Sequence, residues 1–305
     1  MSKIIFVTGL HRSGTTFFGK FLTSFDNTYY IHEPMNPSNK INHLGIIQKF
    51  YWKLPKKKDQ NMSRFVKIKN YIYPFKKNLK HSSTIREIIK SFYYLFFTYI
   101  AKIKSSKIIV KDPFVLFYVS NLKKEIFQKK CEIIILIRDP YNFIASCSKR
   151  NWDFDFNNFL NQRNKFDFFS KNEILLMKKI KNLDNISKLS FLWKIFFYKI
   201  YELKKINKNI NLIFYNNFIK NEKKNARLIS KKLNLKFTKN NIDFLNSLKK
   251  KNQNKKASNI FRKKPINDLN NYKKILSKKE INTVNKICKT EFFALKKIFR
   301  SKAII

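Results

Sequence analysis

A short loop between a predicted buried strand and a predicted helix constrains the fold more than any other part of the sequence. The loop reads GLHRSGTT at residues 9–16, after the apolar run KIIFVT at 3–8 and before a helical pattern at 15–25. Its two glycines permit a tight turn whose backbone N–H groups converge on an anion, and the positive end of the following helix dipole strengthens that attraction. A strand, such a loop and a helix together predict an α/β fold with an anion site.

The loop differs from the phosphate-binding loop of nucleotide hydrolases and kinases. Thr15 and Thr16 stand where those proteins carry a lysine followed by Ser or Thr, and the lysine is the cation that reaches the outer phosphates. Arg12 returns a positive charge from within the loop. Two interpretations follow: an altered triphosphate site, or an intact site for a different anion.

The remaining sequence predicts a parallel, doubly wound sheet. Four further runs have the apolar, β-branched composition of buried strands: 27–33, 106–111, 131–138 and 209–215. Helical patterns lie between and after them: 114–128, 140–150, about 171–206, 218–234 and 277–299. Strands that alternate with helices in this way are typical of an α/β fold with a parallel sheet.

One domain over residues 1–305 is the simplest organisation, since no repeat and no convincing linker is visible. Residues 36–105 form a Lys- and aromatic-rich insertion that we expect to be mostly helical. This insertion could cap the site or be a plain surface elaboration. Residues 249–264 form a basic polar loop before the last helix.

The charge of the chain is strongly positive: 66 Lys and Arg against 19 Asp and Glu, or a net +47. Such an excess indicates an anionic partner such as an acidic acceptor, a polyanion or a membrane surface. The abundant Lys, Asn, Ile, Phe and Tyr also have A/T-rich codons, so genome composition explains the charge equally well. No RNP-like, zinc-finger or helix-turn-helix pattern is present, so we expect no specific nucleic-acid binding.

The cysteines, the start of the chain and its apolar stretches bear on metal binding and on the cellular compartment. Cys131, Cys147 and Cys288 lack metal-ligand spacing, and their odd number argues against a disulfide framework. The start MSKIIFVTG passes directly into a strand and leaves no room for a signal peptide. The apolar stretch at 91–101 is too short to span a bilayer. We therefore expect a cytoplasmic protein without a transmembrane segment.

A second anion motif lies in CEIIILIRDPYNFIASCSKR at residues 131–150. A buried strand ends at Arg138, Asp139 and Pro140 turn the chain, and Ser146 lies two turns along the next helix. Arg138 and Ser146 could therefore clamp one phosphate between a strand end and a helix, the arginine by a bidentate contact.

These two motifs, in this order, resemble those of the sulfotransferases, whose donor is 3′-phosphoadenosine-5′-phosphosulfate. FVTGLHRSGTTFFGKFL is similar to their phosphosulfate-binding loop, and its arginine form resembles the carbohydrate and tyrosylprotein branches. R-D-P followed by a serine eight residues after the arginine is similar to their 3′-phosphate signature. The resemblance covers nearly the whole chain except 36–105. It implies the sulfotransferase fold, with a P-loop-like parallel sheet in three layers, and the nucleotide as co-substrate without a metal.

The resemblance also implies roles for individual residues. It places the 5′-phosphosulfate on Arg12, Ser13, Gly14, Thr15 and Thr16, and the 3′-phosphate on Arg138 and Ser146. Ser258 and Arg262 in the basic loop are further candidates for the 3′-phosphate. The family's Tyr-Glu-Asp-Leu-like turn reads Tyr-Asn-Asn-Phe at 215–218, so we expect any structural role of those acids to be lost. Trp193 is expected to lie in the core.

Sulfuryl transfer needs a base for the acceptor proton and cations for the charge on the transferring group. Glu33 ends the second predicted strand, 21 residues after Arg12, a spacing similar to the family's base. His32 is the competing base, although strand alternation predicts that its side chain points to the opposite face. Lys111 in KDPF would stabilise charge together with Arg12, and Asp112 would orient a neighbour or cap a helix.

Three functions therefore remain. The favoured one is a sulfotransferase acting on an acceptor hydroxyl, most readily that of a saccharide, with a peptide tyrosine as the alternative acceptor. A nucleotide kinase or hydrolase is the second, although it would require the missing loop lysine. A non-catalytic protein that binds polyanions is the third.

Overall fold

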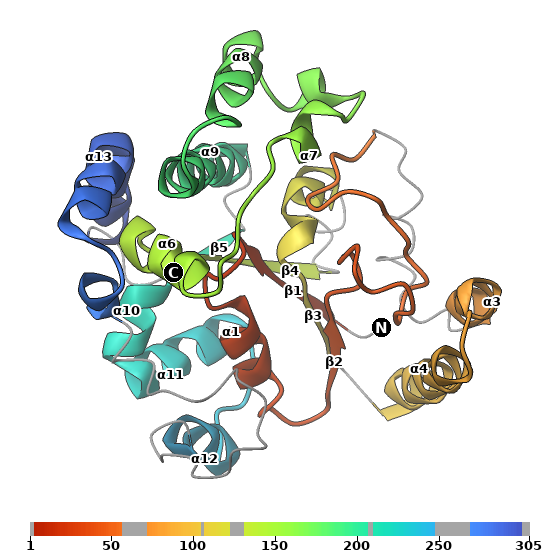
Figure 1. The fold of residues 1–305 in the computed structure, drawn as a ribbon. Helices are drawn as coiled ribbons and strands as arrows, with labels where there is room; N and C mark the ends of the chain where they lie inside the picture. Colours follow the sequence, from red (N-terminus) through yellow and green to blue (C-terminus); the bar gives the residue numbers. More distant parts are fainter. Residues whose placement is uncertain are drawn as a thin grey trace.

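Five parallel strands form the centre of the molecule. The computed structural model describes residues 3–56, 72–104, 107–122, 131–206, 210–247 and 269–300. The strands are β1 (Lys3–Gly9), β2 (Thr28–His32), β3 (Lys107–Lys111), β4 (Cys131–Ile137) and β5 (Asn211–Phe214). Their order in the sheet is β2-β3-β1-β4-β5, and every neighbouring pair is parallel. The predicted α/β fold with a parallel sheet is thus confirmed (Figure 1).

Helices make up most of the other regular structure. They are α1 (Thr15–Leu22), α3 (Ile72–His81), α4 (Ile85–Lys104), η1 (Pro113–Leu122), α6 (Pro140–Ser148), α7 (Asn157–Leu160), η2 (Lys165–Asp167), α8 (Lys171–Ile180), α9 (Asn185–Ile206), α10 (Tyr215–Lys220), α11 (Glu222–Lys232), α12 (Lys239–Ser247), η5 (Asn271–Lys274) and α13 (Lys278–Arg300). None of the helices in these described ranges is long and apolar enough to cross a membrane.

Two apolar layers cover the two faces of the sheet, as the alternation of strand residues requires. Ile5 and Val7 of β1 pack into a cluster with side chains of α1, α10, α11 and α12. Phe6, between them in sequence, packs on the other face with side chains of η1, α6, α9 and α13. The result is a three-layer arrangement of helix, sheet and helix (Figure 1).

Several elements differ from the sequence-based expectation. The helix expected at 114–128 is the 3-10 helix η1, which ends at Leu122 within the described part of the chain. The single helix expected near 171–206 is divided into α8 and α9, and Asp184 accepts a hydrogen bond from the backbone N–H of Ser187 in the first turn of α9. The pattern at 218–234 is likewise divided between α10 and α11.

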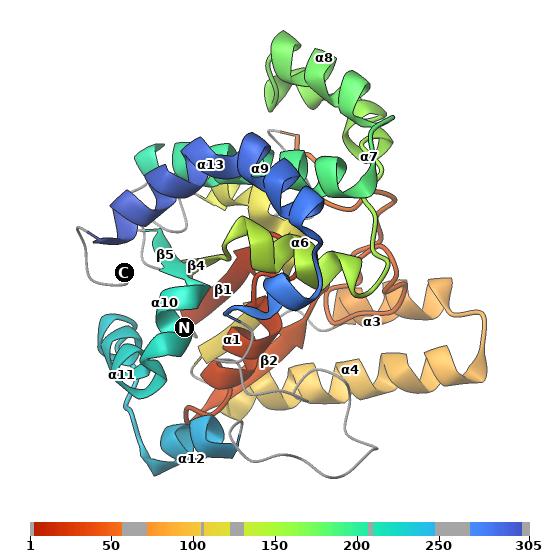
Figure 2. The same ribbon diagram turned by 60° about the vertical axis from the view of Figure 1, so that its left-hand side comes forward.

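Among the described residues of the insertion at 36–105, those at 72–104 form the helices α3 and α4, which lie side by side (Figure 2). Residues 36–56 are irregular but held by internal hydrogen bonds. The Asn42 amide nitrogen donates to the carbonyl oxygen of Ile46 at 2.7 Å, and its oxygen accepts from the backbone of Leu44 and Ile46. Side-chain hydrogen bonds of this kind satisfy backbone groups that would pair with each other in a helix. The segment therefore needs no helix, although one was expected from its sequence.

Candidate active site

The predicted site residues gather at the carboxyl edge of the sheet. β1 lies between β3 and β4, and the chain continues to β2 on one side and returns to β4 on the other. The carboxyl ends of β1 and β4 therefore flank the point where the strand order reverses, which is where open parallel sheets bind ligands. Gly9 ends β1 and Arg138 directly follows β4, so both anion motifs begin at this point.

The loop at 9–16 has two positions, 9 and 14, whose backbone conformation and close surroundings require glycine. Gly9 has φ 144°, and a Cβ there would lie 2.3 Å from the carbonyl oxygen of Leu136. Gly14 has φ 89°, and a Cβ there would lie 2.4 Å from the ring of Tyr215. Arg12 also has a positive φ, 65°. The chain is thus forced into a tight turn that brings its backbone against β4 at Gly9 and against the start of α10 at Gly14.

The loop ends at the N-terminus of α1, which has no side-chain cap. Gly14 occupies the N-cap position and has no side chain that could accept a hydrogen bond from the first N–H groups of the helix. The first N–H groups of any helix have no acceptor within the helix, and the helix dipole places partial positive charge there. Ser13 and Thr15 are buried beside these groups, and Thr16 is half-buried. The geometry is that of an anion site.

The second motif touches the first directly. Arg12 Nε donates a hydrogen bond to Ser146 Oγ at 3.1 Å, although 134 residues separate them in sequence. Arg138 Nη1 donates to the carbonyl oxygen of Arg12 at 3.2 Å, and the Arg138 guanidinium lies 5.4 Å from the centre of the Tyr215 ring. The side chains expected to hold two phosphates of one nucleotide therefore form a continuous group.

Arg138 is positioned by a hydrogen-bonded turn around Asp139. The indole nitrogen of Trp193, a core residue as expected, donates to the carbonyl oxygen of Arg138 at 2.8 Å. Asp139 is the N-cap of α6 and accepts from the backbone N–H of Asn142, with Pro140 at the first helical position. Because the cap fixes where α6 begins, it also fixes where Ser146 lies relative to Arg138.

Asn216, in the turn at 215–218, forms a structural contact with Asp139. Asn216 Nδ2 donates to Asp139 Oδ2 at 2.7 Å, and the backbone N–H of Asp139 donates to Asn216 Oδ1 at 3.3 Å. An amide can make both bonds because it carries a donor and an acceptor, whereas an ionised acid has no donor. Asn216 therefore holds the turn against Asp139 without an acid at this position.

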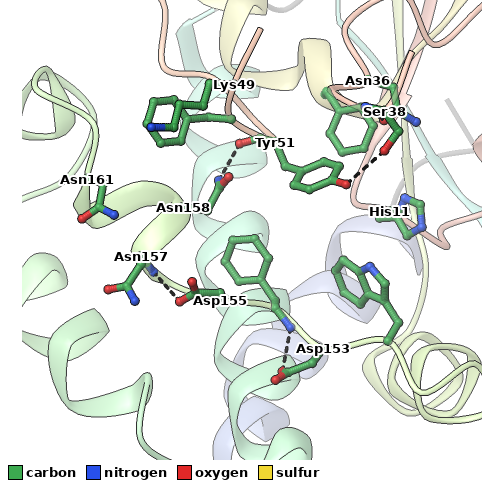
Figure 3. A pocket seen from close by; sticks show the side chains of 14 residues that line it. His11, Asn36, Ser38, Lys49, Tyr51, Asp153, Asp155, Asn157, Asn158 and Asn161 are labelled. Carbon is green, nitrogen blue, oxygen red and sulfur yellow. Dashed lines mark hydrogen bonds between the residues drawn. The ribbon is translucent and has the colours of Figure 1, made fainter. Parts of the chain in front are cut away.

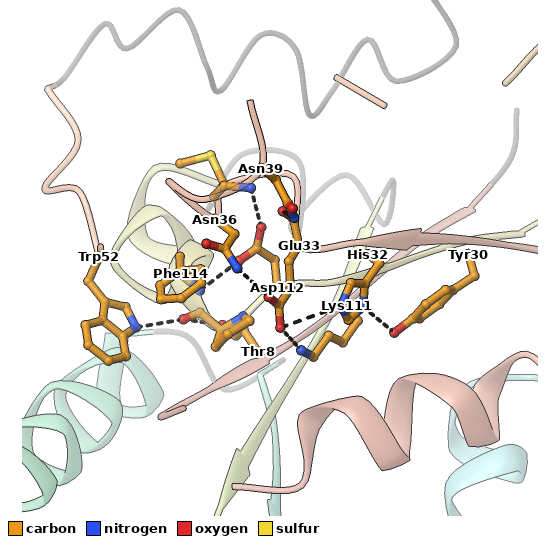
Figure 4. Close-up of polar contacts among 12 residues, drawn as sticks. Thr8, Tyr30, His32, Glu33, Asn36, Asn39, Trp52, Lys111, Asp112 and Phe114 are labelled. Atoms are coloured by element: carbon orange, nitrogen blue, oxygen red, sulfur yellow. Dashed lines mark hydrogen bonds and ion pairs between the residues drawn. The ribbon is translucent and has the colours of Figure 1, made fainter. Parts of the chain in front are cut away.

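Glu33 and Lys111 form an ion pair at the ends of β2 and β3 (Figure 4). Lys111 Nζ contacts Glu33 Oε1, and Asn36 Nδ2 donates to Glu33 Oε2 at 2.8 Å. Burial alone would raise the pKa of Glu33, but the attraction of Lys111 outweighs it and lowers the pKa below its usual value. The carboxylate is therefore ionised at neutral pH, as a general base must be.

Lys111 is almost fully buried, with 2% of its surface exposed. Its stem passes over α1 at Gly19, where a Cβ would lie 3.0 Å from both Cβ and Cγ of Lys111. A residue larger than glycine at this position would push the lysine aside. A buried ammonium group requires a paired anion, and Glu33 supplies it.

The predicted orientation of His32 is wrong. Glu33 has φ 43°, so the strand geometry ends there and the alternation of side chains no longer applies. His32 Nε2 lies 4.0 Å from Glu33 Oε1, and its Nδ1 shares a hydrogen bond with the Tyr30 hydroxyl at 3.1 Å. Burial and the charge of Lys111 lower the pKa of His32. A neutral imidazole thus lies beside the carboxylate rather than across the sheet from it.

Asp112 holds the turn that carries Glu33. It is fully buried and accepts hydrogen bonds from the backbone N–H groups of Met35 at 2.6 Å and Phe114 at 2.8 Å. Burial, aided by the charge of Glu33, raises the pKa of Asp112 to about 7. The side chain therefore ties the start of η1 to the segment after β2, which is the orienting and capping role predicted for it.

A pocket of about 600 Å³ opens beside these residues (Figure 3). It is lined by His11, Asn36, Ser38, Lys49, Phe50, Tyr51, Phe114, Trp152, Asp153, Phe154, Asp155, Asn157, Asn158 and Asn161. His11 belongs to the anion loop, and Asn36 is the residue that holds Glu33. Sequence reasoning missed this pocket because only the tertiary structure brings together its lining residues, many of which lie in irregular segments at 36–51 and 152–155.

His11 is neutral where the pocket meets the loop. Its ring stacks on Trp152 with centroids 5.2 Å apart. Burial, aided by the charge of Arg12, lowers the pKa of His11 to about 4. The loop therefore contributes Arg12 as a cation and His11 as an uncharged ring. Ser258 and Arg262, the other predicted donor contacts, lie outside the described residues.

Comparison with known proteins identifies relatives of this arrangement. A family model described as "Sulfotransferase family" matches residues 5–239. Solved structures that are similar include a sulfotransferase domain from the curacin biosynthetic pathway, with 10% identity and a TM-score of 0.49, covering 94% of this chain and 97% of that one. A sulfotransferase domain from the Synechococcus PCC 7002 olefin synthase has 15% identity and a TM-score of 0.46, covering 93% of each chain. Sulfotransferase STF9 from Mycobacterium avium has 12% identity and a TM-score of 0.43, covering 96% of this chain and 76% of that one. No curated protein matched the sequence.

Proposed function

Because this chain belongs to the sulfotransferase family, we propose that it moves a sulfuryl group from 3′-phosphoadenosine-5′-phosphosulfate to an acceptor hydroxyl. The observation that carries the proposal is the contact between the two anion motifs. Arg12 Nε donates to Ser146 Oγ, and Arg138 donates to the carbonyl oxygen of Arg12. One ligand with two separate anionic groups would use both motifs at once, and the donor nucleotide is such a ligand.

The donor would lie along the carboxyl ends of β1 and β4. We assign its 5′-phosphosulfate to Arg12, Ser13, Gly14, Thr15 and Thr16, where the uncapped helix N-terminus offers N–H groups. Its 3′-phosphate is assigned to Arg138 and Ser146. Arginine offers planar paired donors that match a phosphate, and the Tyr215 ring and the Trp193 indole hold Arg138 in place.

The acceptor would be activated by Glu33. The hydroxyl oxygen attacks the sulfur as its proton passes to the Glu33 carboxylate. The bond between sulfur and the bridging oxygen breaks, and adenosine 3′,5′-bisphosphate leaves with the electron pair. Lys111 and Arg12 stabilise the charge that develops on the transferring group and the bridging oxygen. Lys111 has a second role, since it keeps Glu33 ionised and therefore able to accept the proton.

A saccharide hydroxyl is the acceptor that we propose, with a peptide tyrosine as the alternative. A kinase or hydrolase is less well supported, because the loop lacks the lysine that reaches the outer phosphates. It also gives no role to Arg138 and Ser146, which bracket Arg12.

Nucleotide binding tests this proposal. Thermal unfolding is measured with adenosine 3′,5′-bisphosphate, adenosine 5′-monophosphate and ATP with magnesium, followed by calorimetric titration. We expect the bisphosphate to stabilise the protein most. Arg138→Ala should weaken its affinity roughly 100-fold, through loss of a charge-assisted contact. Arg163→Ala, at an exposed arginine near η2, is the matched control and should bind normally.

Two results would overturn the proposal. Stronger stabilisation by ATP with magnesium would favour the kinase interpretation. Equal affinity for the monophosphate and the bisphosphate would mean that no 3′-phosphate site exists.

A further inference from the structure

We infer that the pocket beside Glu33 receives the acceptor, and that this acceptor is an uncharged polyhydroxyl compound with an apolar face, such as a neutral sugar ring. This inference rests on the proposed function and assigns the second substrate to the pocket (Figure 3). A volume of about 600 Å³ lies within the usual range for small-molecule sites.

The position of the pocket indicates that it binds the acceptor rather than the donor nucleotide. Asn36 lines the pocket and donates to Glu33 Oε2 at 2.8 Å, so the pocket reaches to within one side chain of the proposed base. His11 lines it from the other side and directly precedes Arg12 in the anion loop. A molecule in the pocket would therefore lie between the base and the donor loop, as the attacking hydroxyl requires.

The walls combine flat apolar rings with planar amides. Tyr51, Phe114 and Trp152 supply the rings, and the Tyr51 and Phe114 ring centroids lie 5.3 Å apart. Asn157, Asn158 and Asn161 supply the amides, and Asn158 Nδ2 donates a hydrogen bond to the carbonyl oxygen of Tyr51 at 2.5 Å (Figure 3). Ring faces pack against the C–H face of a sugar, and each amide offers both donors and an acceptor to hydroxyl groups.

The charges of the pocket favour a neutral acceptor. Asp153 and Asp155 line it against a single lysine, Lys49, although the chain as a whole carries +47. Asp153 is paired with Lys188 Nζ at 2.5 Å. A sulfated or carboxylated acceptor would approach two carboxylates here, and a basic protein that selected such an acceptor would line the pocket with lysine and arginine.

The polar walls are held in position without a ligand. Ser38 Oγ and the Tyr51 hydroxyl share a hydrogen bond at 3.3 Å across one side. Asp155 Oδ1 accepts from the backbone N–H of Asn157 at 2.9 Å at the start of α7. Because these bonds fix polar side chains within each wall, the pocket would bind with little loss of conformational entropy.

Acceptor specificity tests the inference. Transfer from radiolabelled donor is measured with neutral disaccharide glycosides, a uronic-acid disaccharide, a sulfated disaccharide and a tyrosine peptide. Acceptor binding is followed separately by saturation-transfer NMR in the presence of adenosine 3′,5′-bisphosphate. We expect neutral saccharides to bind and to react best. Tyr51→Ala should raise their KM at least tenfold without changing bisphosphate affinity, while Tyr201→Ala, at an exposed tyrosine on α9, should change neither.

A variant that removes one negative charge from the pocket provides a second test of acceptor specificity. Asp155→Asn keeps the oxygen that accepts from Asn157 but removes the negative charge, so we expect KM for the uronic-acid acceptor to fall about threefold to tenfold. Asp243→Asn, on the exposed surface of α12, is the control.

The outcomes separate the inference from the proposed function. Preference for the anionic saccharides or the tyrosine peptide, or a Tyr51→Ala enzyme with unchanged KM, would overturn the pocket assignment while sulfuryl transfer stood. Failure to bind the bisphosphate, or to transfer label to any acceptor, would overturn the proposed function itself and the inference with it.

A second inference comes from the outer face of α4, which is independent of the site. Nine of the nineteen large hydrophobic residues exposed in the described part of the chain lie on α3 and α4: Tyr73, Ile85, Ile88, Ile89, Phe92, Tyr93, Phe96, Tyr99 and Ile103. Those on α4 recur at three- and four-residue intervals, so most of them form a stripe along a helix of about 30 Å.

The charges around this stripe indicate its partner, and we propose that it docks on an anionic membrane surface. Residues 72–104 carry seven Lys and Arg against one acid, Glu87, which accepts hydrogen bonds from Ser83. An apolar stripe beside cations matches lipid tails beside anionic headgroups. A second copy of the chain would instead bring two sets of these cations together. Figure 2 shows α3 and α4 projecting to one side of the helical layers, where a flat surface could reach them.

Vesicle co-sedimentation tests the membrane proposal. We expect binding to phosphatidylcholine vesicles that contain phosphatidylserine, and much weaker binding to phosphatidylcholine alone. Ile89→Ser combined with Phe96→Ser should reduce binding at least tenfold, because 64% and 58% of these side chains are exposed and they lie two turns apart. Leu175→Ser on α8 is the control, with a comparable exposure of 54%. Unchanged binding by the double variant, or a dimer in light scattering that the double variant abolishes, would overturn the proposal.

Discussion

In the Glu33–Lys111 pair, two opposing effects act on the pKa of the Glu33 carboxylate. Burial disfavours the charged form, and the neighbouring ammonium group favours it. The second effect is the larger, so the pKa is lowered and the Glu33 carboxylate is ionised throughout the neutral range. Stability from this pair is present above the unfolded pKa of the carboxyl and is lost as pH falls through the lower, folded value.

Replacing Lys111 with Met tests this balance. The variant leaves Glu33 buried without its cation, so its pKa should rise and the acid limb of the profile of kcat/KM against pH should move to higher pH. The variant should also lose about 3 kcal/mol of stability, because the carboxylate stays buried and unpaired. Combining it with Glu33→Gln should recover part of that loss. A pH profile that does not move would show that the two groups are not coupled.

His11 gives a second prediction at this scale, in which stability again falls as the pH falls, but over a higher pH range than for the Glu33 carboxylate. Its folded pKa of about 4 lies below the unfolded value of 6.5, so between these values the unfolded chain takes up a proton and the folded chain does not. Stability should therefore fall as pH drops from about 6.5 to 4, by roughly 2 kcal/mol for this group. Thermal unfolding of the wild type and of His11→Phe across this range checks it. An identical pH dependence in both would contradict it.

Among the elements, the loop at 9–16 depends most on glycine. Gly14→Ala would strain a φ of 89° and drive a methyl group into the Tyr215 ring, which also faces Arg138. We expect a loss of about 1–3 kcal/mol of stability and at least tenfold weaker bisphosphate binding. Gly19→Ala, in α1 against Lys111, is the comparison. It should affect turnover more than donor binding, and equal donor-binding losses in both would argue against a specific role for the loop.

In the turn after β5, replacing Asn216 with Asp should affect both stability and nucleotide binding. Asn216→Asp moves the turn toward the acid of the related motif but places a second carboxylate against Asp139 and removes the donor at 2.7 Å. We expect a loss of about 1–3 kcal/mol in denaturant unfolding and weaker bisphosphate binding through Arg138. Asn217→Asp, the next residue in sequence, is the control. A stable Asn216→Asp variant would mean that the turn does not position the arginine.

The sequence was most informative where elements are regular. Apolar, β-branched runs located all five strands to within two residues, and motifs at strand ends located Arg12, Lys111 and Arg138 at one edge of the sheet. The orientation of His32 could not be predicted because it depends on the backbone of Glu33, whose φ is 43°. The pocket could not be predicted because Asn36, Tyr51 and Trp152 come from irregular segments that only the tertiary structure brings together.

The net charge of the whole molecule differs in sign from the charge of the residues that line the pocket. Its net +47 would draw in any polyanion, and such binding weakens steeply with added salt. The pocket, by contrast, carries two acids and one lysine among its lining residues. We therefore propose that long-range attraction acts on an anionic donor, whereas shape and hydrogen bonds select the acceptor.

Single-turnover transfer of label from radiolabelled donor to a neutral saccharide tests sulfuryl transfer most directly. We predict that the wild type labels the saccharide and leaves adenosine 3′,5′-bisphosphate. Glu33→Gln should bind the donor with unchanged affinity but react roughly 10²–10⁴-fold more slowly, because the amide cannot accept the proton. A wild-type protein that binds the donor but labels no hydroxyl acceptor would contradict the account, and a Glu33→Gln variant that reacts at the normal rate would remove the base from it.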